Sequence, residues 1–97
     1  MQVIAIVRRR TEAFSSQEFD KFLEAEAEAV RTFYIEGSVR AIWSREDALG
    51  AVLLLEAASL GEAQKLLAAL PLVQREMAEV EKVVPLRGYR GFGPRQT

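Results

Sequence analysis

The chain has 97 residues, 49% hydrophobic and 28% charged, which is the balance of one ordinary globular domain. Its 13 basic and 14 acidic side chains give a net charge of -1, so no overall positive field favours a nucleic acid or an anionic membrane as partner. Histidine and cysteine are both absent, which excludes disulfides, thiol or histidine catalysis and the usual zinc ligands.

The N-terminal segment predicts a strand rather than a targeting sequence. Residues 3–7 are apolar and mostly β-branched on both faces of the pleat, as in a strand that is buried on both sides. Residues 8–10 are all arginine, so the apolar run before them is too short for a membrane span or a signal peptide. This arginine run is interpreted as a solvated strand end. We therefore expect a cytoplasmic protein.

A helix is predicted from a capping box at Ser15 and Glu18 to about Tyr34. Stepping 100° per residue places Glu26 in the middle of its apolar stripe, facing the sheet. A carboxylate in that position is desolvated, which raises its pKa and suits a general acid or base. The alternative is a structural carboxylate that pairs with an arginine, Arg40 among them, or that caps backbone donors. The apolar stripe consists of Phe19, Phe22, Leu23, Ala27, Val30, Phe33 and Tyr34.

The rest of the chain predicts three more strands and one more helix. Residues 38–44 and 51–56 are strands joined by a polar turn, and the later of the two is apolar on both faces. A second capping box at Ser59 opens a shorter helix that Pro71 stops. Residues 78–86 form the fourth strand, which Pro85 restricts to an edge or a strand end.

This βαββαβ order indicates an α+β, ferredoxin-like domain over residues 1–86, with a four-stranded antiparallel sheet and both helices on one face. The opposite face would leave an apolar patch in water, so we predict a homodimer whose two sheets pack as a dimeric α+β barrel. The alternative is a stable monomer, or a tail that covers this face. Residues 87–97, rich in Gly and Arg, are interpreted as a tail or as an arm that reaches a neighbouring subunit.

Three further side chains are candidates for the site. Arg40 offers a planar fork for a carboxylate or an enolate oxygen, and Trp43 offers a large apolar wall with one N–H donor. Strand alternation puts Val39, Ala41 and Trp43 on one face and Arg40 on the other, so both candidates line one wall only if a bulge intervenes. Tyr34 could donate from its hydroxyl group.

Several short motifs together carry a family resemblance. They are Glu26, Gly37-x-x-Arg40-x-x-Trp43, Leu66-Leu67-x-x-Leu70-Pro71-Leu72, and a final strand that ends in a Val-x-Pro-Leu pattern. With these motifs the chain resembles the muconolactone isomerase family of dimeric α+β barrels. The order of elements alone also fits the YCII-like and antibiotic-biosynthesis monooxygenase groups.

The resemblance implies a cofactor-free isomerase of aromatic catabolism that moves a proton between two carbons of an unsaturated lactone, in oligomers built from barrel dimers. Glu26 would be the proton shuttle, and Arg40 would hold the side carboxylate or the enolate of the lactone. The chain departs from the family pattern at Ala41, where the family has histidine, and in its apolar third strand. These departures predict a drier pocket and a small, partly apolar carbonyl ligand.

Two other functions remain open from the residues. One is a non-catalytic dimeric barrel that binds a small hydrophobic ligand or serves as an accessory subunit, with Glu26 locked by Arg40. The other is an oxygen-using monooxygenase of the related barrel type, although no set of residues in the chain specifies that activity.

Overall fold

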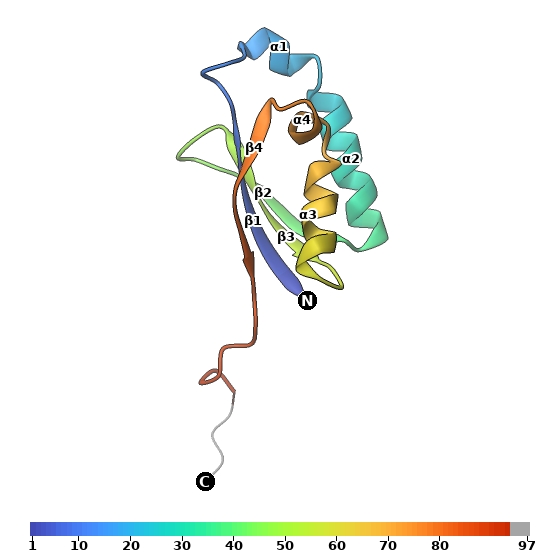
Figure 1. Ribbon diagram of the computed structural model, residues 1–97, viewed down its shortest axis with the longest axis vertical. Helices are drawn as coiled ribbons and strands as arrows, with labels where there is room; N and C mark the ends of the chain where they lie inside the picture. Colours follow the sequence, from blue (N-terminus) through green and yellow to red (C-terminus); the bar gives the residue numbers. More distant parts are fainter. Residues whose placement is uncertain (94–97) are drawn as a thin grey trace.

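The computed structural model describes residues 1–93 of the chain, so the last four residues of the predicted tail lie outside the described part. The elements follow the predicted βαββαβ order, except that each helical segment consists of two helices (Figure 1). In chain order they are β1 (Gln2–Arg9), α1 (Ser16–Asp20), α2 (Leu23–Glu36), β2 (Val39–Ser44), β3 (Gly50–Glu56), α3 (Leu60–Ala68), α4 (Pro71–Gln74) and β4 (Ala78–Pro85).

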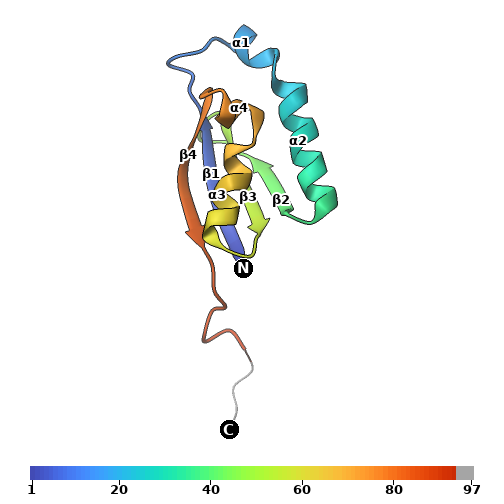
Figure 2. The same ribbon diagram turned by 45° about the vertical axis from the view of Figure 1, so that its right-hand side comes forward.

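The four strands form one antiparallel sheet in the order β2-β3-β1-β4. Figures 1 and 2 show α2 and α3 against the same face of this sheet, which confirms the predicted ferredoxin-like arrangement. The core lies between these layers, where Val3 pairs with Leu55 and Ala5 with Leu53, all of them buried. Pro85 is the last residue of the edge strand β4, as predicted.

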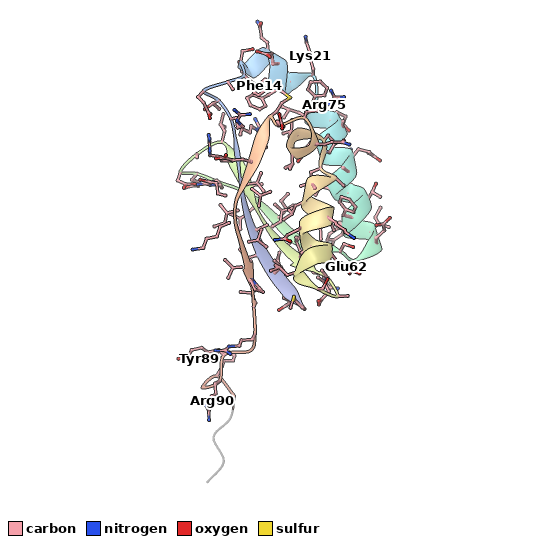
Figure 3. The ribbon with its side chains drawn as sticks, in the orientation of Figure 1. Phe14, Lys21, Glu62, Arg75, Tyr89 and Arg90 are labelled. Carbon is pink, nitrogen blue, oxygen red and sulfur yellow. The ribbon has the colours of Figure 1, made fainter. Side chains whose placement is uncertain are left out.

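The predicted first helix is wrong in one respect, because it is broken after Asp20 into α1 and α2. The break lies at Phe22, whose backbone (φ -118°, ψ -1°) departs from the helical range. The guanidinium of Arg75 lies 4.2 Å from the centre of the Phe22 ring. Phe19 is buried, and its ring and that of Phe14 meet edge to face. Figure 3 shows Phe14 and Arg75 near this junction. Tertiary packing of the two rings, rather than a helix-breaking residue, accompanies the bend.

The predicted faces of the second strand are corrected by a β-bulge. Val39 pairs with Leu55, but Ala41 pairs with Leu54, so Arg40 is the extra residue between them. Val39 therefore faces the helices while Ala41 and Trp43 face the other side of the sheet. A bulge shifts the alternation by one residue, which a strict period of two cannot anticipate.

Pro71 does not simply stop the second helical segment. The helix α3 ends at Ala68, and Pro71 then occupies the first position of the short helix α4. Proline suits this position because its missing N–H would have no helical partner there and its φ is already helical. Leu70, which precedes it, is extended (φ -64°, ψ 131°), as expected before proline.

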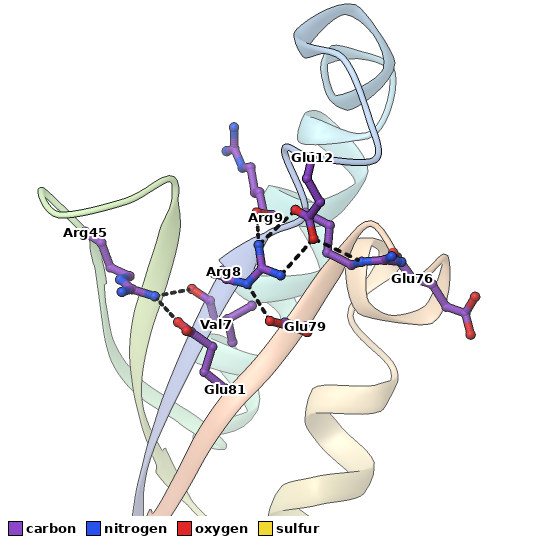
Figure 4. Close-up of polar contacts among 9 residues, drawn as sticks. Val7, Arg8, Arg9, Glu12, Arg45, Glu76, Glu79 and Glu81 are labelled. Atoms are coloured by element: carbon purple, nitrogen blue, oxygen red, sulfur yellow. Dashed lines mark hydrogen bonds and ion pairs between the residues drawn. The ribbon is translucent and has the colours of Figure 1, made fainter.

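Polar contacts hold the end of the sheet where β1 leaves it (Figure 4). Arg8 donates to both carboxylate oxygens of Glu12, at 3.0 and 2.9 Å, and to Glu79 on the edge strand. Arg45 donates to Glu81 and to the carbonyl oxygen of Val7. These contacts tie β4 and the β2–β3 turn to β1, and they fix the backbone just before Arg9.

The β1–β3 pair requires glycine at position 50, because a Cβ atom there would lie 2.1 Å from the carbonyl oxygen of Val7. We expect Gly50→Ala to lower the free energy of unfolding by about 1–3 kcal/mol, since the two strands must separate to admit a methyl group. Urea unfolding measures this loss. The control is Gly61→Ala, where the nearest atom, Ser59 Oγ, lies 3.8 Å away and alanine favours the helix. An equal loss in both variants would contradict the steric explanation.

The face of the sheet turned away from the helices is apolar along its centre; we call it the open face. It consists of the partly exposed side chains of Ile4, Ile6, Val52 and Leu54 and of Trp43, which is 53% exposed. In Figures 1 and 2 no element of the described chain covers this face.

Beyond β4 the chain runs away from the domain (Figure 1). Residues 87–93 contain no strand or helix, and Tyr89 and Phe92 are 80% and 88% exposed. Figure 3 shows Tyr89 and Arg90 well separated from the sheet and the helices. Within residues 1–93, none of the helices is long and apolar enough to pass through a membrane.

Candidate active site

A cavity of about 420 Å³ lies between α2 and the helix-covered face of the sheet, toward the end of β1 that carries the arginines. Its size lies within the range of small-molecule sites, and most of its wall is apolar. Glu26 and Arg9 both line it. The other lining residues are Val7, Leu23, Ala27, Val30, Arg31, Ile42, Ser44, Gly50, Ala51, Leu72 and Ala78.

Glu26 comes from the first half of α2 and is half-buried, on the stripe that includes Val30 and Phe33. Its Oε1 accepts a hydrogen bond from the backbone N–H of Leu72, 46 residues later in the sequence, at 3.0 Å. Leu72 is the second residue of α4, a helix with no side-chain cap from its own N-cap residue. Glu26 therefore caps α4 from across the core, and this bond fixes the direction of its carboxylate.

The second oxygen of this carboxylate, Oε2, makes no hydrogen bond with another described residue. Among residues 1–93 no side-chain oxygen or nitrogen is both fully buried and without a partner. Oε2 is therefore not fully buried, and Glu26 as a residue lines the cavity. The carboxylate thus has one anchored oxygen and one oxygen without a hydrogen bond to the described chain.

Burial raises the pKa of Glu26 above its ordinary range, while the Leu72 N–H and the charge of Arg9 oppose this shift only in part. Desolvation is the dominant cause because it disfavours the ionised form. A carboxylate with a raised pKa is a stronger base than an exposed one, and its protonated form returns the proton closer to neutral pH. These are the properties that a group shuttling one proton needs.

Two arginines, Arg9 and Arg31, line the cavity with Glu26, and Arg31 is paired with Glu24 and Glu28. The guanidinium carbon of Arg9 lies 5.6 Å from the centre of the Phe19 ring, which holds the side chain beneath α1. Among the described residues no ion pair within 4.0 Å joins Arg9 to Glu26. The two side chains therefore line one cavity without a direct ion pair between them.

The other predicted site residues lie elsewhere in this protomer. Arg40 is exposed at the bulge, where its charge, after that of the amino terminus, helps to hold the pKa of Glu56 below its usual range. Trp43 belongs to the open face, and Tyr34 lies on α2 beside a neighbouring hollow. The expected ion pair between Glu26 and Arg40 is not formed within the described chain.

Sequence reasoning missed Arg9 because it interpreted the arginine run as a solvated strand end. The signal that identifies it is the alternation of β1, since Val3, Ala5 and Val7 are all buried under the helices. Position 9 continues that series, so its side chain points to the helix-covered face. No group of three acidic side chains in the described chain is placed to hold a metal ion.

A family model described as muconolactone delta-isomerase matches residues 3–90, which include every helix, all strands but the first residue of β1, and all the residues that line the cavity. The chain belongs to the muconolactone delta-isomerase family. No curated protein matches the chain. In this member of the muconolactone delta-isomerase family the motif Leu70-Pro71-Leu72 has a structural role. Pro71 starts α4, and the backbone N–H of Leu72 in that helix orients the Glu26 carboxylate.

Proposed function

We propose that the protein is a cofactor-free isomerase that moves a proton between two carbons of a small unsaturated lactone or related carbonyl compound, with Glu26 as base and then acid. One observation carries the proposal: Glu26 lines a largely apolar cavity together with Arg9, and only one of its two oxygens is held, by the Leu72 N–H. Membership of the muconolactone delta-isomerase family supports it. The reaction would belong to cytoplasmic aromatic catabolism, as the sequence resemblance implies.

The proposed reaction has two steps. The Glu26 carboxylate removes a proton from the carbon next to the carbonyl, and the electron pair of that C–H bond moves through the carbonyl group to its oxygen as a dienolate. The protonated Glu26 then delivers the same proton to the far carbon of the dienolate, and the carbonyl reforms. Arg9, which lines the cavity and forms no direct ion pair with Glu26, would stabilise the negative oxygen of the dienolate.

A labelling experiment tests this single-carboxylate route. A β,γ-unsaturated γ-lactone is isomerised in D₂O, and NMR measures deuterium at the carbon that receives the proton. If one carboxylate moves the proton, part of the product keeps the original hydrogen. No isomerisation of any unsaturated lactone would contradict the proposal, and complete deuteration at every turnover would contradict the single-carboxylate shuttle.

Sequence reasoning assigned the anionic oxygen to Arg40, and the structure offers Arg9 as a second candidate; we propose Arg9. Arg9→Met should lower kcat/KM by about a hundredfold, because one preorganised donor to the dienolate oxygen is lost. Arg40→Met makes the same chemical change at the bulge and should cost less. Steady-state kinetics on both variants, with thermal melting to show that each is folded, compares the two. A larger loss in Arg40→Met would favour the sequence-based assignment.

We also propose that two protomers pair through the open face, as members of this family are typically oligomeric. Trp43 would then lie in the dimer interface rather than in the cavity of its own protomer. The exposed aromatic side chains of the segment from residue 87 onward support its proposed role as an arm that contacts a neighbouring subunit.

A second candidate function is a non-catalytic barrel that binds a small ligand. The hydrogen bond from Leu72 favours it, because a carboxylate that caps α4 has a structural role without any reaction. If the protein has that function, substitutions at Glu26 would change its stability, and no unsaturated lactone would be turned over by the natural protein or by the variants.

A further inference from the structure

A second hollow of about 350 Å³ adjoins the Glu26 cavity along α2, between the C-terminal half of that helix and β2. We call it the α2–β2 groove. It shares Val30, Arg31 and Ile42 with the Glu26 cavity, so one molecule can extend from one into the other. The remaining residues of the groove are Tyr34, Ile35 and Val39.

The walls of the α2–β2 groove are apolar although an arginine contributes to them. The guanidinium of Arg31 is held by Glu24 at 2.6 Å and by Glu28 at 2.8 Å, and both carboxylates are largely exposed on the outer surface of α2. Only the methylene stem of Arg31 is therefore left to line the groove. At its rim Ile35 is 83% exposed and Tyr34 is 63% exposed, which leaves a large apolar area in water.

The two hollows together form a site with a charged end and an apolar end. Glu26 and Arg9 lie at one end, and beyond Val30 and Ile42 the surface offers only apolar contacts. We propose that the substrate carries an apolar substituent of several carbons on its lactone ring, at the carbon that receives the proton, and that the α2–β2 groove binds this substituent. The inference rests on the proposed isomerase function and names the substrate class of that same site. A bare lactone would leave the groove filled with water.

Two series of synthetic γ-lactones test the inference, each with a 5-alkyl chain lengthened from methyl to hexyl. The β,γ-unsaturated series reports turnover, and the saturated series, which cannot isomerise, reports binding by calorimetry. Each added methylene should raise kcat/KM in the first series and affinity in the second by about fourfold until the groove is filled. Both series use the full-length protein.

A double variant, Tyr34→Ser with Ile35→Gln, makes the rim polar, and neither residue lines the Glu26 cavity. We expect the advantage of hexyl over methyl to fall at least threefold. The matched control is Leu60→Gln, which changes an exposed leucine on α3 that lines neither hollow. The control should keep the full dependence on chain length.

The outcomes separate this inference from the proposed function. Equal values for methyl and hexyl in both series would overturn the inference while turnover itself upheld the isomerase. Chain-length dependence in the saturated series without any turnover would support the groove as a ligand site and contradict the isomerase. If the double variant changed the oligomeric state by sedimentation and left the chain-length dependence intact, the groove would be a contact between copies and the inference would be overturned.

Discussion

Replacing Glu26 by glutamine is expected to lower kcat by about 10²- to 10⁴-fold while the protein stays folded. The amide oxygen of glutamine can still accept the Leu72 N–H, so α4 keeps its cap, but the side chain can no longer take up a proton. Steady-state kinetics with an unsaturated lactone measures the loss, and circular dichroism reports the fold. A variant with unchanged turnover would remove Glu26 from the reaction.

The pH dependence provides an independent test of the same residue. Glu26 must be ionised to accept the first proton, so kcat/KM should rise with pH through its pKa and then level off. Because burial raises that pKa, the rise should lie above the ordinary glutamate range. The Gln variant should lack this limb. A rise within the range of an exposed glutamate would contradict the assignment.

Stability should respond in the opposite direction. The folded state favours the protonated form of Glu26, so its contribution to stability is lost as pH rises from the ordinary glutamate pKa to the raised one. The Gln variant avoids this loss, and at neutral pH its midpoint of thermal unfolding should be no lower than that of the natural protein. Alanine at the same position serves as the control, because it removes the acceptor for Leu72 and should melt at a lower temperature.

If two protomers pair through the open face as proposed, Leu54→Asp is expected to convert the dimer into monomers. Leu54 lies at the centre of the open face, paired with Ile4 on one side and Ala41 on the other. In a symmetric interface the change occurs twice, and each copy loses the burial of a leucine. The dissociation constant of the dimer should therefore rise at least a hundredfold. Analytical ultracentrifugation of the natural protein and the variant at micromolar concentration measures this rise.

The control for this change is Leu60→Asp, which places the same acidic side chain on the first turn of α3, away from the open face. An acidic residue is tolerated at that end of a helix, so the control should sediment like the natural protein. If the natural protein itself sediments as a monomer with the open face in water, the proposed pairing through this face is wrong.

The fold could be predicted because its signals are local. Apolar runs in β1 and β3, the capping box at Ser15, the N-cap at Ser59 and Pro85 at a strand end are each visible within a few residues. At Ser59 the predicted box is incomplete, because the Glu62 carboxylate accepts from the N–H of Ala58. The position of Glu26 could be predicted as well, because Glu26, Val30 and Phe33 all lie within α2, where the helical period is unbroken.

What could not be predicted depends on contacts between distant parts of the chain. The helix breaks at Phe22, whose ring packs against the guanidinium of Arg75, 53 positions later in the sequence. No glycine or proline marks the break in the sequence. The bulge at Arg40 is defined only by the pairing of β2 with β3, and it turns Trp43 to the open face. The partner of Glu26 proved to be a backbone N–H, which no pattern of side chains reveals.

The capping bond between Glu26 and Leu72 has a consequence for comparing proteins of this family. A protein of this family without the proposed reaction would still need an acceptor for the Leu72 N–H at this position, which glutamate or glutamine supplies equally well. Conservation of an oxygen acceptor there is then a poor indicator of activity. A better indicator is a carboxylate, rather than an amide, beside a cavity that an arginine also lines.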